Sequence, residues 1–497
     1  MIAFQMPRMP KNMIFLLDSI FYIFKSFPIM EKLLLAILIV MNACFALSGM
    51  LEQNSELINK IQRNDPKITT VSDFREEKAS EVIAPLMEAL KGNTHVKQLN
   101  LCMWNMGTKN ARMISKALGT GKILIEELFL NGNRIGSEGA NAIARALPKT
   151  KIKKLDLGDN GIDSTGAKSI ASVLERTQLI ELSLGANNIG DEGTEAIAQV
   201  LPKTQLEKLN LSDSNMKDTG AKALITVLPQ TKLKKLNLAV NAMDASLIEE
   251  LANVLPHTHL EELELSHNYA GVAGAKAIAE KLPKTKLTKL NLAENCICDE
   301  GVRELMGDQP QGSPCKQPQV LTYDQLPVLT GELLQVLAYD QLPVLTYDQP
   351  QVLPCKQLKK LSLRRNSISI HGAEAIEKAL MNPEVKLMKL DLSDNFIGDI
   401  GAEKIAHALE MNTTLTKLNL NKNYITDIGA RTLLLALERN KTLTKLDLSY
   451  NGISGEIIEE VKKLIERNEA FARKVAAEGR PLVTGAPARK KPRIESH

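Results

Sequence analysis

Aromatic residues are scarce in this sequence: Phe, Trp and Tyr make up 4% of its 497 residues, and there is one Trp. Hydrophobic residues nevertheless reach 44% and charged residues 24%, a balance that is typical of folded proteins. A chain of this composition must build its core from Leu, Ile, Val and Ala. We therefore expect an aliphatic core rather than one organised around large rings.

Recognisable catalytic and metal-binding motifs are missing as well. The six cysteines form no CxxC pair, and no histidine stands at a spacing that completes a zinc site. Gly119-Thr-Gly-Lys122 ends like a phosphate-binding loop, but Lys116 stands where that motif requires Gly, and Ile123 where it requires Ser or Thr. No nucleophile stands beside a base in a catalytic motif. We expect no catalytic residue, no metal, no cofactor and no enzymatic activity.

Excess positive charge is confined to the C-terminal end. The formal net charge is +4, and residues 470–497 hold seven Lys or Arg and two Glu, so the rest of the chain sums to −1. Nucleic-acid-binding proteins normally have a basic face, so we expect no nucleic acid as partner. The tail residues Arg489, Lys490, Lys491 and Arg493 fit a short nuclear-import signal, with a solvated basic end as the alternative.

An apolar run near the N-terminus, Leu33–Leu47, has the length of a signal-peptide core and is short for a membrane span. Lys32 precedes it, and Cys44-Phe-Ala46 offers small residues for cleavage after Ala46. This pattern predicts an exported or secreted protein with no membrane segment in the mature chain. The alternatives are an uncleaved anchor and a run that is not a functional leader, which would leave the protein in the cytoplasm.

One pattern recurs from Val96 onward: L-x-x-L-x-L-x-x-N-x-I, then Gly-Ala, then I-A-x-x-L. Successive copies are 29 residues apart, then six times 27, then 71, 29, 28 and 28. Self-similarity at such a period indicates a solenoid of stacked units. The copies begin at Val96, Ile125, Ile152, Leu179, Leu206, Leu233, Leu260, Leu287, Leu358, Leu387, Leu415 and Leu443.

Each unit contains two hydrophobic periods. In Leu287-x-x-Leu290-x-Leu292 the last two apolar residues alternate, as in a strand with one buried face, whereas the apolar residues of 274–282 are three and four apart, as on one face of a helix. No unit buries its own face, so the core forms only between neighbours. Because helices are wider than strands, the pattern predicts an α/β horseshoe with a parallel sheet on its concave face and helices on its convex face.

An Asn follows almost every predicted strand, and we expect it to bond main-chain groups in the turn that leaves the sheet. Trp104 and Ser214 take its place in their repeats, where we expect weaker local order. These positions are scaffold rather than chemistry. They are Asn133, Asn160, Asn187, Asn241, Asn268, Asn295, Asn366, Asn395, Asn423 and Asn451.

The unit resembles the ribonuclease-inhibitor type of leucine-rich repeat over residues 96–465, and it is similar to the repeat regions of Ran GTPase activators, NLR receptors and tropomodulins. The segments 61–68 and 89–96 resemble the start of the tropomodulin repeats, which implies a half-repeat that caps the first strand. The resemblance implies a protein-binding function rather than a particular partner.

The repeats and their interruptions divide the chain into seven segments. They are a candidate signal peptide (1–46), an N-terminal cap (47–95), repeats one to eight (96–306), a duplicated low-complexity insertion (307–357), repeats nine to twelve (358–454), a C-terminal capping helix (455–477) and a basic, disordered tail (478–497). In the insertion, residues 319–330 and 335–346 differ at one position, and the block resembles translated mobile palindromic repeats of some intracellular bacteria. It is either a tolerated loop on the convex side or a partner-binding loop.

Side chains between the strand leucines should point to the concave side and form the partner-binding surface. One of these positions is Lys in the last five repeats, which predicts a basic row across the second half of the sheet. Arg364 and Arg365 should widen this row, and Phe129 and Tyr450 should add aromatic contacts. The five lysines are Lys289, Lys360, Lys389, Lys417 and Lys445.

These features favour a non-enzymatic scaffold that binds another protein, as a monomer, on its concave face. The row of lysines suits a partner with an acidic patch, and the leader suits an exported bacterial effector that acts on host proteins in the host cytoplasm or nucleus. A Ran-type GTPase activator is an alternative, with Arg134 as a loop arginine to test, although such activators usually end in an acidic tail. A tropomodulin-like actin binder is another, although the amphipathic N-terminal helices of that family are absent.

Overall fold

The computed structural model describes residues 54–72, 79–308 and 354–478. The candidate signal peptide, residues 309–353 of the insertion, and the tail beyond Glu478 with Arg489, Lys490, Lys491 and Arg493 lie outside the described residues.

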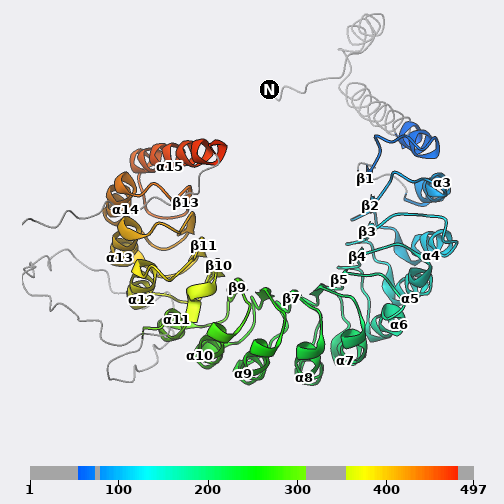
Figure 1. Ribbon diagram of the computed structural model, residues 1–497, viewed down its shortest axis with the longest axis horizontal. Coiled ribbons are helices and arrows are strands. Elements are labelled where there is room, and N and C mark those ends of the chain that lie inside the picture. Colours follow the sequence, from blue (N-terminus) through cyan, green and yellow to red (C-terminus); the bar gives the residue numbers. More distant parts are fainter. Residues whose placement is uncertain (1–53, 73–78, 309–353, 479–497) are drawn as a thin grey trace, which may run out of the picture.

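The described chain forms one parallel sheet of thirteen strands, in which every strand pairs with its neighbours in sequence. Figure 1 shows these strands along the inside of a curve and the helices along its outside, which confirms the predicted horseshoe. The strands are β1 (Thr70–Val71), β2 (Gln98–Asn100), β3 (Glu127–Phe129), β4 (Lys154–Asp156), β5 (Glu181–Ser183), β6 (Lys208–Asn210), β7 (Lys235–Asn237), β8 (Glu262–Glu264), β9 (Lys289–Asn291), β10 (Lys360–Ser362), β11 (Lys389–Asp391), β12 (Lys417–Asn419) and β13 (Lys445–Asp447).

A helix follows each strand on the convex side. The helices are α3 (Ala79–Leu90), α4 (Gly107–Leu118), α5 (Gly136–Ala146), α6 (Ser164–Leu174), α7 (Gly190–Val200), α8 (Asp218–Val227), α9 (Ala245–Val254), α10 (Gly271–Lys281), α11 (Cys298–Met306), α12 (Ile370–Met381), α13 (Gly398–Met411), α14 (Asp427–Arg439) and α15 (Gly455–Ala477). Of the described helices, none combines the length and apolar character needed to cross a bilayer.

The core lies between the sheet and the helices. In it, leucines at the same position of successive repeats pack against one another. Leu290 in β9 pairs in register with Leu263 in β8 and Leu361 in β10, and all three are buried. The residues on either side of such a leucine are only half-buried because they point to the concave face. This alternation is what the sequence period requires.

The insertion does not interrupt the sheet. Lys289 in β9 lies opposite Lys360 in β10, although the two residues are 71 positions apart in sequence. The end of the insertion, Pro354–Gln357, forms the 3-10 turn η7 and buries Cys355 beside Met306, with 3.9 Å between their sulfur atoms. The chain therefore re-enters the repeat with the same geometry that it left.

Buried asparagines connect each turn to the preceding repeat. The Asn366 side-chain oxygen accepts hydrogen bonds from the amides of Asn295 (3.0 Å) and Ile297 (3.2 Å), while its nitrogen donates to the carbonyl of Leu292 (2.8 Å). Ser214 keeps part of this pattern, because its hydroxyl donates to the Leu211 carbonyl at 2.7 Å. The paired acceptor contacts recur at Asn133, Asn160, Asn187, Asn241, Asn268, Asn395 and Asn451.

The residue before each of these asparagines adopts the left-handed backbone conformation. Arg365 has a φ of 55°, Asp394 of 58° and Tyr450 of 56°, and Gly132 is the one glycine among the twelve repeats at this position. The turn that leaves the strand imposes this conformation whatever the side chain. It also directs these side chains away from the rows on the strands.

Replacing Asn366 by Ala should lower the free energy of unfolding by about 3 kcal/mol, because two buried amides and the carbonyls of Leu292 and Arg364 would lose a hydrogen-bond partner. Urea unfolding followed by circular dichroism measures this. Asn188→Ala is the control, since that exposed side chain bonds only Asn215 and its loss should change stability little. Equal midpoints for Asn366→Ala and the unchanged protein would contradict a structural role for the asparagines.

Val240→Gly should stabilise the protein by about 1 kcal/mol, because a β-branched residue is strained at its φ of 57° and its side chain is partly exposed. The same unfolding measurement tests this. A lower midpoint for Val240→Gly would show that contacts of the valine outweigh the backbone strain.

Candidate protein-binding surface

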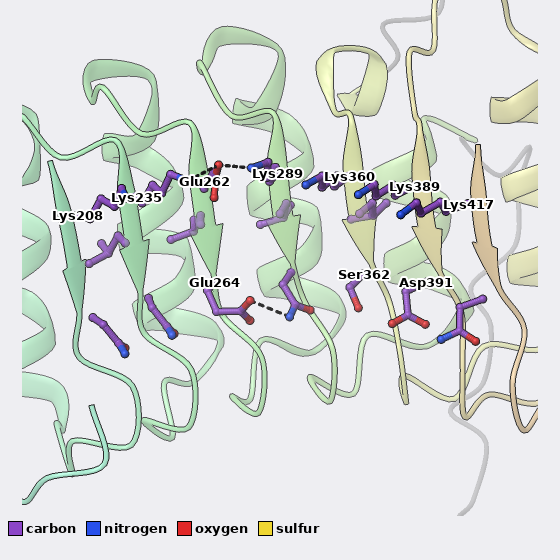
Figure 2. Close-up of a pocket in the computed structure, with 18 of the residues that line it drawn as sticks. Lys208, Lys235, Glu262, Glu264, Lys289, Lys360, Ser362, Lys389, Asp391 and Lys417 are labelled. Atoms are coloured by element: carbon purple, nitrogen blue, oxygen red, sulfur yellow. Dashed lines mark hydrogen bonds and ion pairs between the residues drawn. The ribbon is translucent and has the colours of Figure 1, made fainter. Parts of the chain in front are cut away.

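The concave face holds a groove of about 1060 Å³ that runs from β3 to β13. Its walls are the outward-facing residues of each strand, with Ile465 and Glu469 of α15 at its C-terminal end. Figure 2 shows the lysines lying along one line across the strands, and Glu264, Ser362 and Asp391 along a second line beside it. The groove is therefore bordered by two parallel rows of polar side chains.

The five predicted lysines Lys289, Lys360, Lys389, Lys417 and Lys445 all line this groove, and strand pairing places each opposite the next. Neighbouring strands of a sheet are about 4.8 Å apart, so the lysines form a continuous row.

In the first half of the row, each lysine forms an ion pair with a glutamate on an adjacent strand. Lys154 lies 2.5 Å from Glu127 and Lys208 lies 2.7 Å from Glu181. Glu262 binds two lysines, Lys235 at 2.8 Å and Lys289 on its other side. The hydrogen bond that Lys154 donates to Glu127 raises the pKa of Lys154. This half of the surface therefore presents little net charge.

The second half is different, because Lys360, Lys389, Lys417 and Lys445 form no ion pair with any described residue. Lys389 lies between two like charges, and the fields of Lys360 and Lys417 lower its pKa. We call these four residues the free lysine row. The four positive charges of the row are therefore not paired with a carboxylate among the described residues, although Asp391 and Asp447 line the same groove.

Arg364 and Arg365 do not extend the free lysine row. They lie at the edge of the sheet, where Arg365 contacts Glu294 at 2.9 Å and Asp394 at 3.7 Å, and Arg364 lies 4.0 Å from Glu294. The Glu294 side chain is only 13% exposed, so the arginines are held by a carboxylate that is mostly shielded from water. Their charge is largely balanced within the protein.

The two predicted aromatic residues lie far from each other. Phe129 lines the N-terminal end of the groove, at β3. Tyr450 lies outside the groove and borders a separate cleft of about 380 Å³ between the β13 turn and α15, together with Leu446, Ile458 and Ile465. The structure therefore brings neither aromatic residue into the middle of the lysine row.

The strand residues two positions after the lysines were not predicted as part of the site. Asp391 accepts hydrogen bonds from the amide and hydroxyl of Ser393, at 3.0 and 2.7 Å, and Glu264 accepts one from Asn291 at 2.9 Å. The alternation of strand side chains could have identified this second row. Its carboxylates keep their charge, but among the described residues no ion pair joins Asp391 to a lysine of the groove.

Nine segments of the chain match the family described as Leucine Rich repeat: residues 123–144, 149–171, 177–198, 203–224, 257–279, 284–306, 385–406, 412–434 and 439–461. The chain is a leucine-rich-repeat protein. The repeats that contain β2, β7 and β10 are not among the nine segments, but they belong to the same sheet and keep its register. Curated proteins include none that matches this leucine-rich-repeat chain.

Solved structures similar to this leucine-rich-repeat protein include an internalin, part of a leiomodin and a tropomodulin domain. An internalin from Listeria monocytogenes is 18% identical, with 81% of this chain and 86% of the internalin covered and a TM-score of 0.37. The Leiomodin-1 Actin-Binding Site 2 is 24% identical over 25% of this chain and 74% of its own, with a TM-score of 0.24. The tropomodulin C-terminal domain of Caenorhabditis elegans is 20% identical over 25% and 75%, with a TM-score of 0.22.

The side chains that could bind a metal or react as thiols are spread over the described parts of the leucine-rich-repeat array. Within residues 54–72, 79–308 and 354–478, no three His, Cys, Asp or Glu side chains gather so that they could hold a metal ion. Burial raises the pKa of the Cys355 thiol to about 12, so this thiol stays protonated. Burial also raises the pKa of Cys102 and of Cys298.

Lys389 should titrate below its ordinary pKa and Lys154 above it, because the first has cationic neighbours and the second a glutamate. Carbon-13 NMR of reductively methylated lysines measures both. Lys360→Gln should raise the pKa of Lys389 by removing the stronger of the two fields, while Lys208→Gln, on distant β6, should leave it unchanged. Titration of Lys389 above Lys154 would contradict the arrangement of charges described here.

Proposed function

We propose that this protein is a non-enzymatic scaffold that holds a partner protein on the concave face of its sheet, with an acidic patch of that partner lying against the free lysine row. The observation that carries the proposal is the contrast between the two halves of the groove. Four lysines in β10–β13 lack the glutamates that neutralise their counterparts in β4–β9.

Uncompensated like charges in register are unfavourable for the free protein, and an anionic partner removes this cost. The effect on binding is expected mainly in the association rate and in its salt dependence, because the lysines keep part of their surface open to water. The lysines of the first half already form ion pairs with glutamates, so an anionic partner would gain less by binding there. The C-terminal half of the groove is therefore the proposed docking region.

Reversing Lys389 and Lys417 to Glu should abolish recovery of the partner, because the centre of the row would then repel an acidic surface. Affinity capture with the full-length chain, followed by mass spectrometry at low and high salt, tests this. We expect loss of at least about tenfold in recovered partner for the double variant.

The matched control reverses Lys109 and Lys116, two exposed residues of α4 on the convex side, with the same change in net charge. This control should capture the same proteins as the unchanged chain. Capture of an identical set by Lys389→Glu/Lys417→Glu would refute the proposed docking region.

Export, and action on host proteins as a bacterial effector, is our proposal for the biological setting; the basis is the candidate leader in the sequence. Proximity labelling with the full-length chain reports compartment and partner together. The proposal that the protein acts as a monomer is tested by light scattering.

The two alternative functions have separate tests. A GTPase activator would accelerate GTP hydrolysis by a Ran-type GTPase, and Arg134→Ala would remove an exposed loop arginine available for that role. A tropomodulin-like protein would slow elongation of actin filaments at their pointed ends. An unchanged rate in either assay excludes the corresponding function.

A further inference from the structure

Four large apolar side chains lie exposed together at the edge of the sheet in repeats ten and eleven. Phe396 is 57% exposed, Ile400 59%, Tyr424 64% and Ile428 71%. Phe396 and Tyr424 directly follow Asn395 and Asn423, two of the asparagines that recur after the strands. The two isoleucines lie in the first turns of α13 and α14. We call these four residues the apolar edge patch.

The patch is continuous because equivalent positions of neighbouring repeats lie side by side. The rings of Phe396 and Tyr424 are stacked, with 5.6 Å between their centroids and 10° between their planes. Ile400 and Ile428 occupy the same position in their repeats, four residues beyond the rings. Exposed aromatic pairs of this kind are uncommon on a surface that nothing covers, and aromatic residues are enriched where partners bind.

The other ten repeats show that the fold does not require apolar residues here. Where repeats ten and eleven carry Phe396 and Tyr424, the others carry mostly polar or small residues: Asn105, Arg134, Gly161, Asn188, Asn215, Ala242, Tyr269, Cys296, Ser367 and Gly452. Where repeats ten and eleven carry the isoleucines, the others carry Lys109, Glu138, Thr165, Glu192, Thr219, Ser246, Ala273, Glu300, His371 and Glu456. The patch is therefore an addition to the repeat rather than part of its core.

The size of the patch indicates what could cover it. Each side chain exposes roughly 100 Å², so the patch offers roughly 400 Å² of apolar surface. A stable dimer needs about 800 Å² from each partner, which the patch alone cannot supply to a second copy of this chain. It has the size of an apolar anchor within a larger interface.

The free lysine row supplies the rest of that interface. Lys389 and Phe396 belong to one repeat, and Lys417 and Tyr424 to the next, so each ring lies seven residues beyond a free lysine. At about 3.3 Å per residue, the α-carbons of each lysine and its ring are at most about 23 Å apart, within the span of one ordinary interface.

The charged groups beside the patch are already engaged within the protein. Asp394 pairs with Lys422 at 3.3 Å and with Arg365. The Asp399 carboxylate accepts hydrogen bonds from the amides of Thr426 (2.7 Å) and Gly429 (3.0 Å). The ion pairs offset the charge of Asp394, whereas Asp399 keeps its negative charge, which the amides at the start of α14 partly offset.

We propose that the apolar edge patch binds apolar side chains of the same acidic partner that lies on the free lysine row, so that recognition requires an acidic strip and an apolar cluster no more than about 23 Å apart. This inference rests on the proposed function and specifies the partner's chemistry. The lysines accelerate association, and the patch slows dissociation.

Two synthetic peptides test this with the full-length protein. One carries ten glutamates, a six-residue Gly-Ser linker and Leu-Phe-Leu; the other ends in Ser-Ser-Ser instead. Fluorescence anisotropy should give a Kd at least about fivefold lower for the Leu-Phe-Leu peptide, because the linked apolar group binds intramolecularly. Phe396→Ser/Tyr424→Ser should remove that gain and leave the binding of the Ser-Ser-Ser peptide unchanged.

The substitutions are chosen from within the array, because Ser367 already occupies this position in repeat nine, so folding should be preserved. Tyr269→Ser is the matched control: it removes an equally exposed ring, at the same position of repeat seven, that has no such neighbours, and it should leave both peptides bound as before. Equal loss of the gain in Tyr269→Ser would overturn the inference.

The failures of the two proposals are distinguishable. If the glutamate peptides bind and Lys389→Glu/Lys417→Glu abolishes their binding, but Leu-Phe-Leu adds nothing, the apolar edge patch is not a binding site and the lysine row still is. If neither peptide binds the unchanged protein, both proposals are overturned.

Discussion

Parallel pairing between identical positions of successive repeats is the constraint on which the rest of this structure depends. A strand of three residues cannot be stable alone, so each is held by its two neighbours, by the leucines that stack beneath it and by an asparagine that bonds the preceding turn. The pairing stays in register even between β9 and β10. Every residue type that recurs in the sequence is thereby converted into a row in space.

A row of equivalent positions places like charges next to one another on successive strands, so that their fields act in the same place. The charge of a lysine next to a glutamate is offset by the ion pair. Lysines that have only lysines as neighbours in the row repel one another, and this repulsion lowers the pKa of Lys389. The difference between the two halves of the groove depends on which residue occupies one position in β3, β5 and β8: there it is Glu127, Glu181 and Glu262. A few substitutions at one position of the repeat therefore set the electrostatic character of a whole surface.

The period of the leucines was enough to predict the fold and to place the lysine row, because a strand with one buried face has only one way to orient its side chains. Two features could not be predicted that way. β1 has two residues and lacks the motif, so it becomes visible only through its pairing with β2. Arg364, Arg365 and Tyr450 were assigned to the concave face, but they lie where the left-handed turn leaves the sheet, and their partners depend on that turn.

The apolar edge patch was likewise outside the reach of a strand-based prediction, since its residues lie in loops and first helical turns. Its signal in the sequence is a departure from the repeat rather than agreement with it. In this array, residues that follow the pattern build the core, and residues that break it are the candidates for binding. Comparison of the repeats with one another can take the place of comparison with relatives.

The in-register joint across the insertion has a consequence for how such a surface can change over generations. Because β9 and β10 pair in register although 71 residues separate Lys289 from Lys360, gain or loss of one whole repeat would lengthen or shorten each row of the groove by one side chain. The number of repeats would then set the length of the binding surface. A lineage carrying this architecture could therefore lengthen or shorten its binding surface one repeat at a time.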